Sequence, residues 1–372
     1  MKINSEQQAA RAAGPNRPSG MAQSGERETV QVQAARRGGP GVLKVVHAHY
    51  RQPAEGQVLI GTQFAGINFA DIMARMGLYP GGPRLPLVPG LEVSGTIEST
   101  GTGVEGFSPG DRVCALTRFG GYSSRVVVDQ AQVRPVPPGV GQEAAAALPV
   151  TYLTAYLMMF TQGNLQPGQT VLIHSAGGGV GTAAVQLAAH IGARIIGTAS
   201  AGKHERLREM GVDLCIDYRS GDFVAEVQKA TSGLGADLIL DAQGPAHALR
   251  SLKALAPLGT LVLYGVQQKI GRTRLGPGLL RLLWELRTVR LAPLRLMNAS
   301  KGIYGFHLGR LDSRPGPVRK AFDELLVWLA EGRINPVVDK IFPYDQARQA
   351  HDYIQDRRNF GKVLLDFRAA HK

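Results

Sequence analysis

The chain has 372 residues, of which 44% are hydrophobic, and its 42 Lys and Arg residues against 29 Asp and Glu residues give a formal net charge of +13. This length supports two domains of the usual ~100–200 residues, and no apolar run approaches the ~20 residues of a transmembrane helix, so we expect a cytoplasmic protein. Two cysteines exclude a disulfide framework and a four-thiolate zinc site, and positive charge spread as single arginines without stacking aromatics argues against a nucleic-acid partner.

The first part of the chain predicts a tail followed by a β-rich domain. Residues 1–28 are rich in Ala, Gln, Gly, Ser and Pro and show no hydrophobic period, which predicts a disordered N-terminal tail. Short apolar runs separated by Gly and Pro then predict strands at Thr29–Ala34, Val42–His47, Val58–Phe64, Glu92–Ser99, Arg112–Leu116 and Ser123–Val128. We expect these strands to form a small irregular β-barrel.

From about Val150 the pattern changes to strand, glycine turn and helix in repetition. The predicted strands are Val171–His174, Arg194–Thr198, Leu214–Asp217, Leu238–Asp241, Leu261–Tyr264 and Gly302–Phe306. The predicted helices between them are Val180–His190, Lys203–Met210, Phe223–Thr231 and Ala246–Leu255. This alternation predicts an α/β domain, a doubly wound parallel sheet with helices on both faces.

The last part of the chain predicts elements that return to the first domain. They are a helix at Val318–Glu331, a strand at Val337–Phe342, a helix at Tyr344–Asp356 and a strand at Lys362–Phe367. The expected domains are therefore a tail over 1–28, a discontinuous β-rich domain over 29–150 and 311–372, and an α/β domain over 151–310.

A glycine-rich turn joins the first predicted strand of the α/β domain to its helix. Ala176 stands where the first glycine of a G-x-G-x-x-G fingerprint makes the tight turn, Gly178 lets the backbone approach a pyrophosphate, and Gly181 lets the helix pack on the strand. Gly179 and Val180 supply N–H groups of the helix's first turn, which favours an anion. The segment predicts a dinucleotide site.

The end of the second predicted strand indicates which dinucleotide binds. NAD sites usually carry an Asp or Glu there, about 20 residues past the glycines. This strand instead ends Gly197-Thr198-Ala199-Ser200, without a carboxylate, and Lys203 follows. A neutral rim with an ammonium suits a 2′-phosphate, so we expect NADPH.

Several stretches together resemble a known family. They are residues 65–75, Gly77-Leu78-Tyr79, the glycine turn, residues 197–205, Gly305-Phe306-His307-Leu308-Gly309 and residues 359–365. These resemble the zinc-free quinone oxidoreductase branch of the medium-chain dehydrogenase/reductase superfamily, and within it the vesicle amine transport protein homologues. The resemblance implies a GroES-like substrate domain, a Rossmann domain that binds NADPH, and a homodimer.

The resemblance also implies which residues form the site. It places Ser200, Lys203 and Tyr218 around the adenosine phosphate, Gln243, Gly265, Phe306 and Leu308 toward the nicotinamide, and Asn359 with Lys362 over the cofactor. The family's Asn and Tyr are Asn68 and Tyr79, which we expect to line the acceptor pocket as hydrogen-bond donors. For Asn68, a turn-stabilising amide is an equal alternative.

The residues do not predict a metal site. Zinc-dependent relatives need a Cys near Asn68 and a His in a Gly-His-Glu triplet, where this chain reads Gly90-Leu91-Glu92. The histidines at positions 47, 49, 174, 307 and 351 have no ligand-like spacing.

Without a Lewis acid, hydride transfer from NADPH to a quinone or another conjugated carbonyl is favoured, because the product's negative charge is delocalised. One alternative is an enoyl-thioester reductase whose acyl-CoA phosphates meet Arg272, Arg274, Arg281, Arg287, Arg290 and Arg295. Another is an NADPH-binding, lipid- or membrane-associated protein with little catalysis. Its support is an amphipathic helix expected within Leu279 to Met297 and ended by Pro293.

Overall fold

The computed structural model describes residues 27–267, 280, 284, 285, 287, 289 and 293–371. The expected N-terminal tail therefore lies almost entirely outside the described residues. In the stretch from Leu279 to Met297, residues 279, 281–283, 286, 288 and 290–292 also lie outside the described residues.

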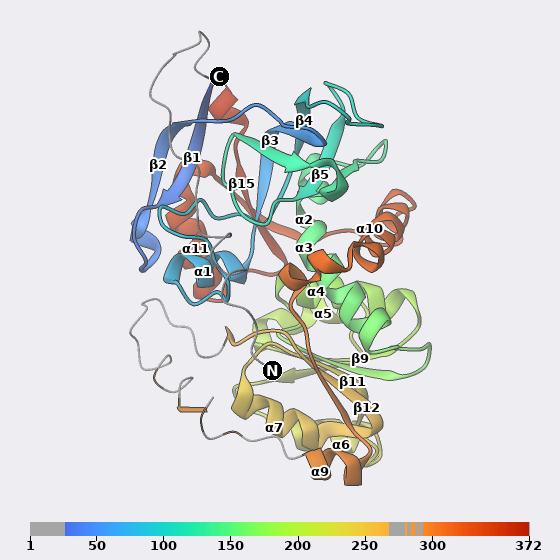
Figure 1. The fold of residues 1–372 in the computed structure, drawn as a ribbon. Coiled ribbons are helices and arrows are strands. Elements are labelled where there is room, and N and C mark those ends of the chain that lie inside the picture. The colour runs from blue at the N-terminus through green and yellow to red at the C-terminus, as the bar shows by residue number, and fades with distance from the viewer. Residues whose placement is uncertain are drawn as a thin grey trace, which may run out of the picture.

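The β-rich part contains a hairpin and a curled sheet (Figure 1). The antiparallel hairpin consists of β1 (Glu28–Ala34) and β2 (Leu43–His49). The sheet has the order β14-β15-β3-β4-β5-β7, and β6 also pairs with β3. Its strands are β3 (Gln57–Ile67), β4 (Glu92–Thr100), β5 (Arg112–Leu116), β6 (Arg125–Asp129), β7 (Val133–Pro135), β14 (Val338–Pro343) and β15 (Lys362–Asp366). Because β3 pairs with three partners along its length, the sheet bends around a closed core.

The chain's C-terminal part returns to this sheet. Val363 of β15 pairs with Ile67 of β3, and β14 runs parallel to β15 at the edge. Helix α10 (Pro315–Ala330) instead buries Phe322 and Leu325 in a core that also holds residues of the parallel sheet. The domain boundaries at 150 and 310 stay a prediction.

The second sheet has six strands, all parallel, in the order β10-β9-β8-β11-β12-β13. The strands are β8 (Thr170–His174), β9 (Arg194–Ala199), β10 (Leu214–Asp217), β11 (Ala236–Asp241), β12 (Leu255–Leu263) and β13 (Gly302–Gly305). This is the doubly wound order, and the predicted fold class is confirmed. The order reverses between β8 and β11, where such sheets bind ligands at the carboxyl ends of their strands.

Helices cover both faces of the parallel sheet (Figure 1). They include α4 (Gly179–His190), α5 (His204–Glu209), α6 (Phe223–Ala230) and α7 (Pro245–Ala254). Alternate residues of β8 enter opposite cores: Ile173 packs with Leu187 of α4, whereas Leu172 packs with Val227 of α6. Burial on both faces explains why β8 reads as a continuous apolar run rather than an alternating one.

Some helices differ from the sequence prediction. The helices α1 (Phe69–Met76), α2 (Gln142–Ala147) and α3 (Pro149–Tyr156) were not predicted, and α11 (Ala347–Gln355) begins after a separate 3-10 turn at Tyr344–Gln346. Before Pro293 the described residues 280, 284, 285 and 287 are helical and Val289 is not, and a separate helix, α9 (Pro293–Ala299), which was not predicted, begins at Pro293 itself. Proline fits the first helical position, where its missing N–H has no intrahelical role.

The described residues also form short helical turns. They are 3-10 segments at Pro40–Val42, Gln130–Gln132, Ala201–Lys203, Leu308–Ser313 and Arg368–His371 and a π-helix at Leu157–Gln162.

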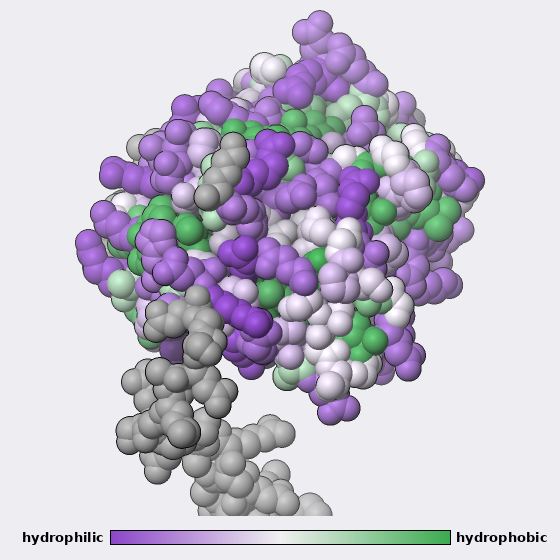
Figure 2. All heavy atoms as spheres, turned by 90° about the horizontal axis from the view of Figure 1, so that it is seen from above, coloured by the Kyte–Doolittle hydropathy of each residue, from purple (hydrophilic) through white to green (hydrophobic). Residues whose placement is uncertain are grey.

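Two observations bear on membranes. Among the described residues, no helix combines the length and apolarity needed to cross a bilayer. On the face drawn in Figure 2, apolar residues form separate small patches surrounded by polar ones.

Candidate functional site

The glycine turn lies between β8 and α4, as predicted. Ser175 takes a left-handed conformation with φ 57°, and Gly178 precedes the helix without any side chain capping its first turn. A Cβ on Gly181 would overlap the carbonyl oxygen of Ser175 and stand 2.6 Å from that of Ala176. Only glycine therefore lets the helix begin this close to the strand. The uncapped N–H groups of residues such as Gly179 and Val180 suit an anion.

The chain's C-terminal segment lies against this turn. The Gly361 N–H donates to the carbonyl oxygen of Gly177 at 3.1 Å, and Gly361 forms a bridge with Gly178. The Asn359 amide donates to the carbonyl oxygen of Gly361 at 2.8 Å, which holds the segment's shape. The structure thus brings Asn359 close to the turn, and its place over the cofactor stays a prediction.

A positively charged rim surrounds Lys203 beside the turn. The Lys203 ammonium donates to the carbonyl oxygens of Arg357 at 3.1 Å and Asn359 at 2.5 Å, which leaves one of its three N–H donors. Burial lowers the pKa of Lys203; Asp339 opposes this shift, and the charges of Arg206, Arg357 and Arg219 add to it. We call Lys203, Arg206, Arg219 and Arg357 the basic rim.

The sequence prediction named only Lys203 of this rim. Arg206 follows Lys203 by three residues, a spacing that places two side chains on one helix face and that could have indicated it. The arginine at 357 could not be found this way, because only the fold brings it near. Of the other predicted adenosine contacts, Ser200 precedes the 3-10 turn that carries Lys203, and Tyr218 is 38% exposed beside Arg219.

The segments predicted to reach the nicotinamide meet at the carboxyl edge of the parallel sheet. The Gln243 amide donates to the Ser175 hydroxyl at 2.7 Å. Gly265 approaches the end of β11 so closely that a Cβ would stand 3.2 Å from that of Ala242. The Phe306 N–H donates to the carbonyl oxygen of Leu263 at 2.8 Å, and Leu308 packs on the adjoining core.

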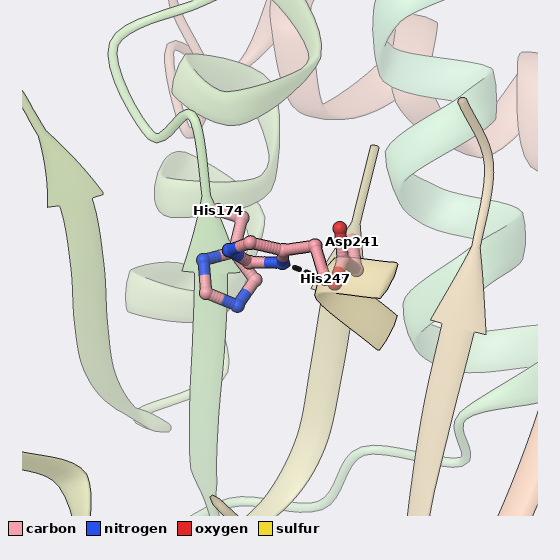
Figure 3. Close-up of side chains that lie close together, drawn as sticks. All are labelled: His174, Asp241 and His247. Atoms are coloured by element: carbon pink, nitrogen blue, oxygen red, sulfur yellow. Dashed lines mark hydrogen bonds and ion pairs between the residues drawn. The ribbon is translucent and has the colours of Figure 1, made fainter. Parts of the chain in front are cut away.

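Beneath this edge, three side chains bring possible metal-ligand atoms within 4.8 Å of one another: His174, Asp241 and His247 (Figure 3). His174 and Asp241 end β8 and β11, and His247 comes from α7. The sequence prediction missed this group, because its members come together only through the neighbouring strands. Among the described residues it is the one group with this geometry.

These side chains form a hydrogen-bond network with Ser251 and Thr198. The imidazole of His247 and the hydroxyl of Ser251 both donate to Asp241 at 2.7 Å. Ser251 has then used its proton, so the contact of 3.2 Å with His174 Nε2 makes that nitrogen a donor, and His174 Nδ1 accepts from Thr198 at 3.1 Å. Both nitrogens of His174 are engaged, and a metal would have to break this network. The donor set therefore fits a hydrogen-bonded support for the strand ends better than a metal centre.

The charges in this network are consistent with that reading. Burial lowers the pKa of His174 to about 3, so its ring is neutral at pH 7. Burial alone would raise the pKa of Asp241, but the hydrogen bond from His247 and the two nearby imidazoles lower it overall.

A second buried polar group, which we call the Lys362 network, joins Asn68, Glu92 and Lys362. The Lys362 ammonium forms an ion pair with Glu92 and donates to the Asn68 amide oxygen at 2.6 Å. The Asn68 amide nitrogen donates to Glu92 at 2.8 Å, and the second Glu92 oxygen accepts from the Val150 N–H at the start of α3 at 2.7 Å. The resemblance placed Lys362 over the cofactor, but its ammonium is engaged here.

Asp71 positions Asn68 in this network. Its carboxylate accepts from the Asn68 N–H at 2.8 Å and from the Gly90 N–H at 2.9 Å, which ties the start of α1 to the strand that carries Glu92. Burial raises the pKa of Asp71 to about 7, and the two backbone donors partly oppose this shift. Asn68 both begins α1 and bonds two charged side chains, and one of its two amide N–H groups remains for another acceptor.

Tyr79 lies in a separate group of contacts. Its ring packs edge-on against Phe119 at 5.7 Å between centroids and against His307 at 5.1 Å. The loop after α1 and the segment after β13 therefore meet at Tyr79.

Comparison with known proteins identifies the family. Residues 54–138 match a family model described as an alcohol dehydrogenase GroES-like domain, and residues 210–365 match one described as a zinc-binding dehydrogenase. The chain is 40% identical over 315 residues to the human synaptic vesicle membrane protein VAT-1 homolog, which covers 84% of this chain and 79% of that protein. The chain belongs to the medium-chain dehydrogenase/reductase family.

Solved structures of this oxidoreductase family show the same fold. The Escherichia coli quinone oxidoreductase complexed with NADPH matches with a TM-score of 0.80 and 29% identity over 91% of this chain and 99% of that one. The CurK enoyl reductase matches with a TM-score of 0.78 and 27% identity over 91% and 99%. The predicted branch of the medium-chain dehydrogenase/reductase family is thereby confirmed.

Proposed function

We propose that the chain is a zinc-independent, NADPH-dependent reductase that transfers a hydride to a quinone or another conjugated carbonyl. The observation that carries the proposal is the basic rim beside an uncapped helix start, because the two together match a 2′-phosphate and a pyrophosphate. The NADPH in the Escherichia coli relative supports the same cofactor here.

Each part of the site has a role in this proposal. NADPH, when bound, supplies the hydride and becomes NADP⁺. The N–H groups at the start of α4 hold the pyrophosphate, and the free donor of Lys203 with Arg206 and Arg219 holds the 2′-phosphate. Ser200 and Tyr218 flank the adenosine, while Gln243, Gly265, Phe306 and Leu308 orient the nicotinamide. Asn359 keeps the C-terminal segment against the turn.

In this proposal, Asn68 and Tyr79 form the pocket for the hydride acceptor. The remaining Asn68 N–H and the Tyr79 side chain line the acceptor pocket, and the Lys362 network fixes the Asn68 amide. Leu91 cannot ligate a metal, and no cysteine lies near Asn68, where zinc-dependent relatives need a thiolate. A conjugated acceptor delocalises the negative charge that it gains from the hydride, so its reduction needs less charge stabilisation by the protein than the reduction of a simple ketone.

The test is NADPH oxidation by purified protein with a naphthoquinone, a simple enone and crotonyl-CoA, with NADH in parallel. We expect turnover with the quinone or the enone, and NADPH to be strongly preferred. Failure to bind either dinucleotide contradicts the proposal.

An enoyl-thioester reductase is the second candidate, supported by the likeness to the CurK enoyl reductase. Turnover with crotonyl-CoA but not with quinones would select it. Of the six arginines expected to meet CoA phosphates, only Arg287 and Arg295 lie among the described residues.

The family resemblance also leads us to propose a cytoplasmic homodimer. Vesicle flotation at low and high salt tests the membrane-associated alternative.

A further inference from the structure

His307 lies where the two parts of the chain meet at Tyr79. A Cβ on Gly309 would stand 3.0 Å from the Tyr79 hydroxyl and 3.1 Å from the His307 ring. One on Gly81 would stand 3.1 Å from the guanidinium of Arg310. Residues 307–310 thus pack on the loop at 79–81, and the two flanking glycines leave little space for larger side chains there.

The two nitrogens of the His307 ring have no partner. Both are buried without a hydrogen bond, which holds for no other histidine among the described residues. The ring of His351, by comparison, still pairs with Tyr122 through Nε2. A buried polar group without a partner costs ~1–3 kcal/mol, so such groups in native proteins call for an explanation, and a bound ligand is one.

The backbone turns this ring away from the core. His307 is extended, with φ −149° and ψ 103°, and in extended chain neighbouring side chains point to opposite sides. Phe306 is buried in the core of the parallel sheet, whereas His307 packs against Tyr79. Its ring therefore faces the acceptor side of the segment that we propose for nicotinamide binding.

We propose that His307 donates a hydrogen bond from its neutral ring to the carbonyl oxygen of the acceptor. This role rests on the proposed reductase function. As the hydride forms a bond to the conjugated carbon, an electron pair moves onto the carbonyl oxygen, which gains negative charge. An N–H group already in position stabilises that charge, as oxyanion-hole donors do. The proton that completes the reduction comes from water, so His307 remains neutral throughout.

The charge state of the ring agrees with this role. Burial lowers the pKa of His307 and the charge of Arg310 adds to this shift, with only its own backbone opposing it, so the neutral ring is favoured at pH 7. A neutral imidazole has one N–H donor and one acceptor nitrogen. Neutral imidazole acting as an electrophile toward a carbonyl is an established form of catalysis.

The experiment compares His307→Leu, which removes the donor, with His307→Gln, which keeps one. At saturating NADPH, kcat/KM for the accepted quinone or enone should fall at least ~10-fold in His307→Leu, as for other oxyanion donors, and recover largely in His307→Gln. Binding of NADPH, followed by fluorescence, should stay unchanged. His49→Leu, at an exposed end of β2, is the matched control and should behave as wild type.

A second measurement does not depend on turnover. Phenanthrenequinone bound to the NADP⁺ complex should show a carbonyl stretch at lower frequency in wild type and His307→Gln than in His307→Leu. The role is overturned if His307→Leu keeps kcat/KM within twofold, if its loss comes from weaker NADPH binding, or if the carbonyl bands coincide. Failure of wild type to reduce any acceptor would instead overturn the proposed function itself.

Discussion

The glycine turn and the Lys362 network adjoin the same short segment of chain, through Gly361 and Lys362, yet they are built differently. The turn is made of consecutive residues at a helix start that no side chain caps, beside a rim of positive side chains. The Lys362 network is made of buried side chains from positions 68, 92 and 362, which are far apart in the sequence. The first leaves backbone donors without side-chain partners, and the second satisfies its charges internally.

The difference shows which polar groups remain available to a ligand. Lys203 keeps an N–H donor after bonding two carbonyl oxygens, while the Lys362 ammonium is enclosed with a carboxylate and an amide. We therefore expect changes in the Lys362 network to alter folding stability first, and changes around the turn to alter cofactor binding first.

The largest effect is expected from Lys362→Met. This change leaves Glu92 buried without its ion partner, and breaking such a pair typically costs ~3–5 kcal/mol of unfolding free energy. Urea unfolding measures it, and the double variant Glu92→Gln/Lys362→Met should recover most of the loss. If Lys362→Met instead keeps its stability and weakens NADPH binding, Lys362 belongs with the turn and the distinction between the two regions fails.

Acidification should destabilise the protein through the hydrogen-bond network of His174, Asp241 and His247. The pKa of His174 is lowered from 6.5 to about 3 in the folded protein, so the unfolded chain binds the proton more tightly. Stability is therefore fully present above pH 6.5 and is lost as the pH falls; at pH 5 the loss is roughly 2 kcal/mol. Urea unfolding at pH 7 and pH 5 checks this. The dependence should be weaker in His174→Gln and unchanged in the exposed His49→Gln.

The sequence predicted the turn but not the networks, for physical reasons that particular residues show. Gly181 and its neighbours are consecutive, and the pattern of apolar residues around them placed the turn between a strand and a helix. Glu92 entered the sequence analysis only as part of Gly90-Leu91-Glu92, a triplet that lacks the histidine of zinc-dependent relatives. A carboxylate at the start of an apolar strand could have indicated a buried partner, but no sequence spacing identifies Lys362 as that partner.

Other omissions have the same origin. The helix α1 has only 8 residues, about two turns, too short a window for a helical period to be recognised, and its start depends on the bond between Asn68 and Asp71. In the sequence, the histidines were considered as metal ligands only by their spacing. Spacing cannot indicate that His174 and His247 lie together, because the order of the strands brings them into contact.

A methyl group at the turn should weaken cofactor binding. In Gly181→Ala the new Cβ meets the carbonyl oxygens of Ser175 and Ala176, so the start of α4 must move away from its place on the strand. We expect the Kd for NADPH to rise about 10-fold, equivalent to ~1.4 kcal/mol. Fluorescence titration measures it. Gly316→Ala, where a Cβ meets nothing within 4 Å, is the matched control.

The smallest effect is expected from Arg219→Ala at the edge of the basic rim. Arg219 is exposed, so solvent and salt screen its attraction to a 2′-phosphate, and a single surface charge contributes ~0.2–1 kcal/mol. The Kd for NADPH should rise about threefold at low salt and less at high salt, while the Kd for NADH, which lacks that phosphate, stays the same. An equal loss for both dinucleotides would mean that Arg219 supports the local fold rather than the phosphate. The preference for NADPH would then have to come from the other members of the basic rim, Lys203, Arg206 and Arg357.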